Sequence, residues 1–227
     1  MGPIDEYRST DVQHSIDAQY CGRHFISRCG KPGVDMNGKA YANRKSVSER
    51  PVSDNYPTPI ALVQELVNLK IIKRDQMVYE PAAGDGQLAG VLLSSGFNVC
   101  ATDLIRDGID FLSRKSDCSQ IVTNPPFSLF DDFVMKAKDL SPFVVMIGKT
   151  NFFAAQSRYK NGVWKHLKHV YIFSRQIDYR TPLGSLEMNV GNLVTGWFVW
   201  DRRWNKPYWN TSIIDVQKYC TLGAVKE

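Results

Sequence analysis

The stretch Ile121-Val122-Thr123-Asn124-Pro125-Pro126-Phe127 decides the fold. It begins with a short apolar run that is typical of a buried strand, and an amphipathic helix pattern follows it. Proline lacks an N–H and fixes φ at about −65°, so two consecutive prolines can neither continue a strand nor lie inside a helix. The chain should therefore form a rigid, extended turn just past a strand end. Open α/β sheets bind their ligands there, outside the carboxyl ends of the strands.

The same stretch presents three groups that suit a planar amine. The side chain of Asn124 and the backbone carbonyl of Pro125 can each accept a hydrogen bond, and Phe127 offers an aromatic face for stacking. An ordinary Pro-Pro turn is the alternative interpretation. The residues upstream favour a ligand site.

A glycine-rich turn follows an earlier strand. The pattern predicts a strand at Met77–Tyr79, the turn Glu80-Pro81-Ala82-Ala83-Gly84-Asp85-Gly86, a helix from Gln87 to about Ser95 and a second strand at Asn98–Thr102. This is a βαβ unit. Gly84 and Gly86 can reach positive φ and let the backbone approach a ligand closely. The turn is not the dinucleotide fingerprint, because it has only two glycines, spaced G-x-G, after a proline.

Carboxylates at two strand ends narrow the ligand. Glu80 suits a cationic amino-acid group better than a pyrophosphate, which it would repel. Asp103 follows the second strand, where it can accept hydrogen bonds from both hydroxyls of a ribose, as an acidic residue does in dinucleotide-binding folds. These features describe a nucleoside that carries an amino acid, and S-adenosylmethionine fits. A tight turn and an exposed aspartate without a ligand are the alternative.

The next elements are less regular. No convincing apolar strand precedes Asp110-Phe111, which would contact the adenine of the cofactor at a third strand end or else cap a surface helix. The continuous apolar run Phe143–Ile147 predicts a central parallel strand. We interpret His169–Ser174 and Leu193–Trp200 as an antiparallel pair at the sheet edge. The tail from Asn210 carries no pattern.

Composition limits the class of protein. The chain has 227 residues, a net charge of +5 and a sequence pI near 8.9, which permits a phosphate-rich partner. Five scattered cysteines do not suggest a disulfide framework. No apolar run reaches the roughly 20 residues that span a bilayer, and no secretory signal pattern opens the chain. We therefore expect a cytoplasmic protein without a membrane partner; its oligomeric state stays open.

Residues 1–53 lack a sustained period and are predicted to form a basic arm or a small irregular subdomain, ahead of one domain over 54–227. Cys21, His24 and Cys29 resemble half of a zinc knuckle. A structural zinc site needs four ligands, and no second cysteine pair follows. We therefore predict no metal, with a zinc-binding arm as the alternative.

The motifs in this order resemble the S-adenosylmethionine-dependent N6-adenine DNA methyltransferases, over about residues 54 to 200. The resemblance rests on Glu80–Gly86, the acidic second-strand end and Asn124–Phe127, with Tyr56-Pro57-Thr58-Pro59 similar to the N-terminal cofactor motif. The motif order resembles the gamma group, and the compact size is like that of bacteriophage enzymes, which implies a host cytoplasm. The implied cofactor site comprises Tyr56, Thr58, Pro59, Glu80, Ala82, Gly84, Gly86, Asp103, Leu104, Asp110, Phe111 and Asn124.

Catalysis would be carried by Asn124, Pro125, Pro126 and Phe127. Two acceptors can hold both N–H groups of the adenine amine and direct its lone pair at the sulfonium methyl. Phe127 would stack on a base that has left its helix. The remaining substrate contacts are predicted from the aromatic and basic residues further along the chain: Asn151, Phe152, Phe153, Arg158, Arg175 and Arg180.

We therefore predict a Rossmann-like class I methyltransferase fold, with a mostly parallel seven-stranded sheet and helices on both faces. The predicted activity is methylation of adenine N6 in DNA. Three alternatives stay open: an RNA adenine N6-methyltransferase, a protein glutamine N5-methyltransferase and a nucleic-acid-binding module without activity.

Overall fold

The computed structural model describes residues 57–177, 179 and 193–216. Its centre is a seven-stranded sheet in the order β2-β1-β3-β4-β6-β5-β7. The strands are β1 (Val78–Glu80), β2 (Val99–Ala101), β3 (Gln120–Thr123), β4 (Phe143–Lys149), β5 (Leu167–Phe173), β6 (Thr195–Asp201) and β7 (Asn210–Ile214). All neighbouring strands are parallel except β6, which runs antiparallel to both β4 and β5.

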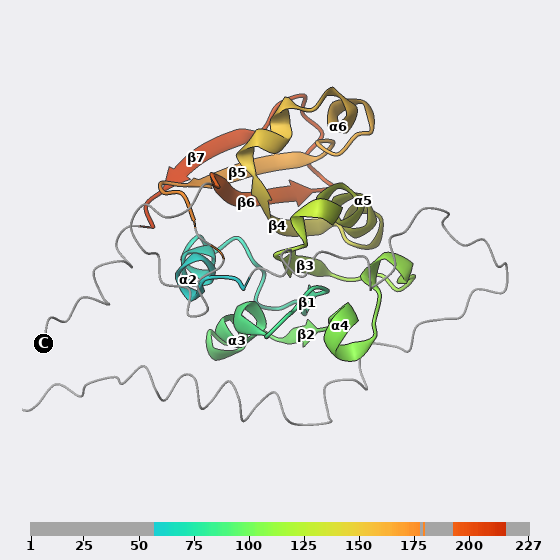
Figure 1. Cartoon of the computed structure of the whole chain (residues 1–227), viewed down its shortest axis with the longest axis vertical. Helices are drawn as coiled ribbons and strands as arrows, with labels where there is room; N and C mark the ends of the chain where they lie inside the picture. The colour runs from blue at the N-terminus through green and yellow to red at the C-terminus, as the bar shows by residue number, and fades with distance from the viewer. Residues whose placement is uncertain (1–56, 178, 180–192, 217–227) are drawn as a thin grey trace, which may run out of the picture. The chain divides into compact units, whose positions relative to one another are not determined.

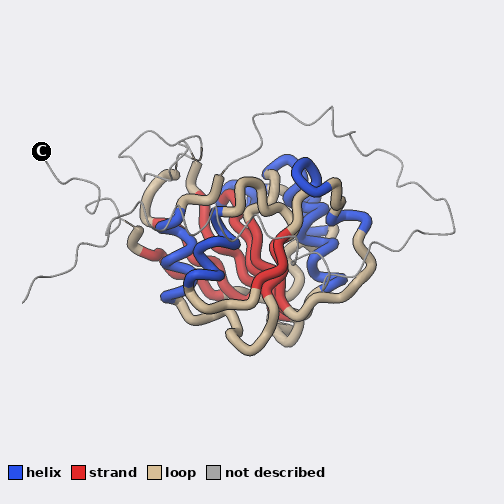
Figure 2. The backbone as a smooth tube through the Cα atoms, turned by 90° about the horizontal axis from the view of Figure 1, so that it is seen from below, coloured by secondary structure: helices blue, strands red, loops and turns tan. Residues whose placement is uncertain are grey.

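Helices cover both faces of this sheet (Figures 1 and 2). The α-helices are α2 (Ile60–Asn68), α3 (Gln87–Ser94), α4 (Leu104–Asp107), α5 (Phe130–Leu140) and α6 (Gln156–Lys160), and the 3-10 turns are η3 (Phe111–Ser113), η4 (Phe127–Leu129) and η5 (Thr150–Ala154). In Figure 1, α2 and α3 lie on one side of the sheet and α5 lies on the other. The predicted fold class is therefore confirmed.

Large side chains of β6 bond to a helix and to a turn that pack against the sheet. Trp197 donates its indole N–H to the carbonyl of Leu62 in α2, at 3.1 Å. Trp200 donates to the carbonyl of Val163, at 3.0 Å. Because successive strand residues point to opposite faces, β6 can pack against both layers, and every one of its residues is buried.

A glycine at the end of β4 sets how closely α5 approaches the sheet. A Cβ atom at Gly148 would lie 2.8 Å from Cε2 of Phe130, the first residue of α5. Phe130 is almost fully buried and also contacts the rings of Phe152 and Phe198. The glycine thus lets α5 begin directly against the sheet, just after the Asn-Pro-Pro-Phe stretch.

Three predictions about elements need comment. The pairing of β5 with β6 is confirmed, but its expected position at the sheet edge is wrong, because β7 pairs with the outer side of β5. The tail from Asn210 therefore supplies an edge strand that the sequence did not indicate. Asp110-Phe111 belongs to a 3-10 turn and not to a third strand.

Some expectations fall outside the described residues. The arm over residues 1–53, with Cys21, His24 and Cys29, is one of them. Within the described part of the chain, no group of three or more His, Cys, Asp or Glu side chains could hold a metal ion. In the same part, no helix is long and apolar enough to cross a membrane.

Candidate active site

Four adjacent parallel strands end along one edge of the sheet. From β2 through β1 and β3 to β4, the chain leaves these strands near Asp103, Glu80, Asn124 and Lys149. The sequence predicted the first three positions as site residues. The structure therefore brings the predicted cofactor and catalytic motifs together at the carboxyl edge, as expected for an open α/β sheet.

The turn after β1 adopts the predicted left-handed backbone. Gly84 has φ 50° and Gly86 has φ 84°. The N–H of Ala83 donates to the carbonyl of Thr102 at 3.1 Å, and the N–H of Gly86 donates to the carbonyl of Ala83 at 2.8 Å. Gly86 then begins α3. Residues with a Cβ rarely adopt these φ values, which explains the two glycines.

Glu80 is a buried acid at the end of β1. Its side chain is only 1% exposed, and its Oε2 has no hydrogen-bond partner among the described residues. Burial raises the pKa of this carboxyl well above its ordinary value, although a backbone hydrogen bond from Ala89 and, to a smaller extent, the charge of Arg106 act in the opposite direction. A buried carboxylate with one oxygen left unpartnered is costly, so the site favours a ligand that brings a cation.

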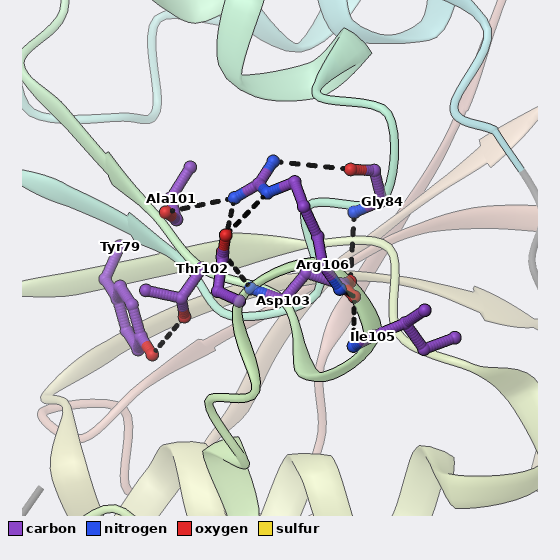
Figure 3. A network of polar contacts seen from close by, with 8 residues as sticks. Tyr79, Gly84, Ala101, Thr102, Asp103, Ile105 and Arg106 are labelled. Carbon is purple, nitrogen blue, oxygen red and sulfur yellow. Dashed lines mark hydrogen bonds and ion pairs between the residues drawn. The ribbon is translucent and has the colours of Figure 1, made fainter. Parts of the chain in front are cut away.

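Asp103 joins the turns after β1 and β2 (Figure 3). Its Oδ1 accepts from the N–H groups of Ile105 at 2.8 Å and Arg106 at 3.3 Å, so it caps α4. Its Oδ2 accepts from the N–H of Gly84 at 3.1 Å. A carboxylate has about four acceptor positions, and three are used here. The structure thus leaves room for one ribose hydroxyl, whereas we predicted two.

Arg106, which was not among the predicted site residues, connects the two turns through its hydrogen bonds. Its guanidinium bonds both carboxylate oxygens of Asp107, at 2.6 and 2.9 Å, and it also donates to the carbonyls of Gly84 at 3.3 Å and Ala101 at 3.4 Å. The hydrogen bond from Arg106 lowers the pKa of Asp107. Asp107 in turn accepts from the N–H of Asp103 at 2.9 Å. In the sequence, the spacing of Asp103 and Asp107 by four residues, with Arg106 between them, was the pattern that could have indicated this network.

Asp110 and Phe111 support the structure of this region. The Oδ1 of Asp110 accepts from the N–H of Leu112 at 3.0 Å, so its side chain caps a turn, which was the alternative interpretation. Phe111 is 2% exposed and packs between Tyr79 and Phe133, with ring centroids 6.1 and 5.0 Å apart. Phe111 is therefore a core residue in this structure, and we do not assign it to the adenine pocket.

The remaining predicted cofactor residues are placed as follows. Ala82 and Leu104 are half-buried, in the turn after β1 and at the start of α4. Thr58 and Pro59 are buried immediately before α2. Tyr56 lies outside the described residues. Their contacts with a cofactor stay predictions.

The Asn-Pro-Pro-Phe stretch leaves β3 without a cis peptide bond among the described residues. Asn124 and Pro125 are buried. The carbonyl of Pro126 accepts from the N–H of Leu129 at 2.9 Å, which starts η4, whereas no described backbone N–H donates to the carbonyl of Pro125. The acceptor that was predicted at Pro125 is thus not consumed by the backbone of the following turn.

Phe127 is packed more tightly than predicted. It is 6% exposed, and its ring contacts Phe152 and Tyr179 at nearly perpendicular angles. The ammonium of Lys149 lies over the ring, 4.6 Å from its centroid. Stacking of a base on this face requires Lys149 to move. Lys149 was not among the predicted site residues, although it lies at the carboxyl end of a strand, as Glu80 does, and Asn124 directly follows one.

The two phenylalanines after β4 have different surroundings. Phe152 lies beside Phe127, with ring centroids 6.3 Å apart, so its ring adjoins the Asn-Pro-Pro-Phe stretch. Phe153 stacks on Trp209 at 5.1 Å and also packs against Trp164 and Phe198. Its ring is part of a separate aromatic cluster, so Phe152 is the better placed of the two, and the contact of either ring with a base stays a prediction.

The predicted basic residues are only partly placed at the site. Arg158 is bound to Asp131 at 2.6 Å and covers the ring of Phe152, so its charge is already neutralised. Asn151 is exposed in η5, and Arg175 is half-buried in the bend after β5. Arg180 lies outside the described residues.

No protein-family model matches the sequence, and no curated protein matches it significantly. Among solved structures, the chain is similar to a proposed RNA methyltransferase from Pyrococcus horikoshii, with 19% identity, a TM-score of 0.44, and coverage of 67% of this chain and 88% of that one. It is also similar to the modification subunit of a proposed type I restriction enzyme from Vibrio vulnificus YJ016, with 13% identity, a TM-score of 0.46, and coverage of 72% of this chain and 47% of that one. A third similar structure is TrmN from Thermus thermophilus, with 19% identity, a TM-score of 0.42, and coverage of 62% of this chain and 48% of that one. The chain spans about half the length of the last two.

Proposed function

We propose that the protein transfers a methyl group from S-adenosylmethionine to the N6 amine of adenine in DNA. The observation that carries this proposal is the position of Asn124–Phe127 at the end of β3, directly beside β1. That strand ends at the buried carboxylate of Glu80, whose Oε2 has no hydrogen-bond partner among the described residues. Residues that can bind a methyl-accepting amine therefore lie next to residues that can bind a cationic ligand, at the carboxyl ends of neighbouring strands.

The residues after β1 and β2 fit the cofactor. The Oε2 of Glu80 would accept a hydrogen bond from its ammonium, which supplies the cation that this buried acid lacks. The positive-φ glycines would let the backbone pass close to its amino-acid part. The remaining acceptor position of Asp103 would bind one ribose hydroxyl. When bound, S-adenosylmethionine supplies an electrophilic methyl group on a sulfonium.

The acceptor residues would act on the adenine amine. The side-chain oxygen of Asn124 and the carbonyl of Pro125 would accept its two N–H groups and draw the nitrogen toward tetrahedral geometry. The nitrogen lone pair would then form the new N–C bond as the bond from the methyl carbon to sulfur breaks, its electron pair would return to sulfur as the neutral thioether leaves, and one N–H proton would be lost to solvent afterwards. Acceptors placed where positive charge develops stabilise the transition state, and holding the amine in line lowers the entropic part of the barrier.

Product analysis tests this proposal. The full chain is incubated with methyl-labelled cofactor and, in separate reactions, with DNA, RNA or a mixture of proteins; the products are digested and identified by mass. We expect N6-methyladenine in DNA. Label in RNA would replace DNA with RNA as substrate, and label on glutamine would overturn the nucleic-acid assignment. Cofactor binding without any labelled product would favour a binding module.

A further inference from the structure

Lys149 is a half-buried cation at the end of β4, on the acceptor side of the candidate site. Its Nζ lies 4.6 Å from the centroid of Phe127 and 5.9 Å from that of Phe152. No carboxylate among the described residues forms an ion pair with it. The ammonium therefore rests on aromatic rings, with no neutralising carboxylate in the part of the chain that the structure describes.

Arg158 provides the contrast within the same cluster. It also lies over Phe152, at 4.4 Å, but Asp131 holds its guanidinium at 2.6 Å. Of the two cations on this aromatic pair, only Lys149 keeps a charge that no described carboxylate balances. Lys149 is therefore the better candidate for binding an anionic group from a ligand.

The sheet order indicates which ligand this is. The cofactor turns follow β1 and β2, whereas Lys149 follows β4, on the far side of β3. An anionic group of the cofactor would have to reach across the Asn-Pro-Pro-Phe stretch. An anion bound by Lys149 would thus belong to the substrate, and in a nucleic acid that anion would be a backbone phosphate.

We propose that Lys149 is a positioning residue that exchanges partners when the target nucleotide binds. In the free protein it covers the face of Phe127; the incoming adenine takes that face, and the ammonium moves to a phosphate next to the target nucleotide. This inference rests on the proposed function. A cation on a ring is worth about 2- to 30-fold in affinity, depending on how far it is desolvated, and a stacked base about 5- to 150-fold. The base should therefore displace the ammonium, which gains a phosphate partner in exchange.

The test measures how DNA binding depends on salt. The probes are a 12-nucleotide single strand with one adenine and the same strand with an abasic site at that position. Each neutralised phosphate of a single strand contributes about 0.7 to the slope of log K against log salt. We expect the slope of the wild-type protein to be steeper by about 0.7 for the adenine strand, because only the base releases Lys149. In Lys149→Met this difference should vanish.

Further variants distinguish a role of Lys149 in positioning the DNA from an effect on folding. Lys149→Arg should restore the slope difference, and Lys149→Met should raise KM for DNA about tenfold with cofactor affinity unchanged. The matched control is Lys206→Met. The ammonium of Lys206 also lies over an aromatic ring, Trp204, at 4.9 Å. Lys206 follows β6, whose end pairs with the start of β4, so it lies at the amino-terminal ends of the parallel strands, opposite the candidate site. This variant should behave like the wild type.

Each other outcome is informative. An unchanged slope difference and KM in Lys149→Met, with an active wild type, would overturn the role of Lys149 alone. A loss of cofactor affinity in that variant would assign Lys149 to the cofactor instead. A wild-type protein that neither binds nor methylates DNA would overturn this inference together with the proposed function.

Discussion

The two halves of the candidate site are held together by different forces. The cofactor half, which comprises Glu80, Gly84, Gly86 and Asp103–Asp107, is tied by hydrogen bonds, many of them to backbone groups. The acceptor half, which comprises Asn124–Phe127, Lys149, Phe152 and Tyr179, is packed by rings and a cation. Hydrogen bonds fix direction, whereas contacts between rings and cations can be exchanged. The first half is thus preformed, and the second can admit a large substrate.

Asn124→Ala should have the largest effect and should separate the two halves. Removing one hydrogen-bonding group aimed at developing charge costs about 10²- to 10³-fold in kcat. Cofactor affinity should change less than about twofold, because the cofactor half is braced independently of this residue. Single-turnover methylation and calorimetric cofactor binding measure the two effects. Retained turnover would refute the catalytic assignment.

Glu80→Gln tests the cofactor half at its buried charge. Loss of a charged hydrogen bond costs about 1.5–3 kcal/mol, which is about 10- to 150-fold in cofactor affinity. The free protein should respond differently. Because the folded pKa of Glu80 is raised above its ordinary 4.5, its contribution to stability is present below that pH and is lost as pH rises through the folded pKa.

The variant should therefore unfold at a higher temperature than the wild type in neutral buffer, and this difference should shrink toward pH 4. Thermal unfolding across pH, without cofactor, measures it. Equal melting temperatures at every pH would show that the acid is not destabilising in the free protein.

Asp103→Ala removes the junction between the turns after β1 and β2. Loss of a helix cap costs about 0.5–2 kcal/mol of stability. Freeing the Gly84 turn should also reduce the free energy of cofactor binding by a similar amount. Asp103→Asn is the matched control, because asparagine also caps helices well. Urea unfolding should show a large loss for alanine and a small one for asparagine. Equal losses would mean that the charge, and not the cap, holds the junction.

Arg158→Met should have the smallest effect. The ion pair with Asp131 is partly exposed, with 21% and 45% of the two side chains accessible, so it should contribute about 0.2–1 kcal/mol. Because Asp131 already neutralises the arginine, the salt dependence of DNA binding should stay unchanged. A slope that falls by about 0.7 would instead restore Arg158 as a phosphate contact.

The sequence predicted best where a short apolar run ends in a polar residue. Glu80, Asp103 and Asn124 were found in this way, because parallel strands place their ends at one edge. Lys149 shares this position but lacks a motif, so it was missed. Which of Phe152 and Phe153 faces Phe127 depends on how the 3-10 turn η5 is oriented, and two identical adjacent residues give no sequence signal for that orientation.

Tertiary contacts explain the other differences. Arg158 meets Asp131 across 27 positions of the chain, and no local pattern encodes that pair. The strand at Asn210–Ile214 is short and has mostly exposed side chains, so it carries little hydrophobic signal. Its partner is β5, some forty residues earlier, and the pairing becomes visible only in the folded sheet.

The reversed direction of β6 has a consequence for insertions in the chain. Because β6 runs antiparallel to β4 and β5, β5 ends and β6 begins at the carboxyl edge, where Thr195 pairs with Lys149. The connection between them leaves and returns on the side of the candidate site. Insertions there need not disturb the strand pairing. Under the proposed function, changes in its length would alter substrate contacts without changing the residues at the ends of β1, β2 and β3.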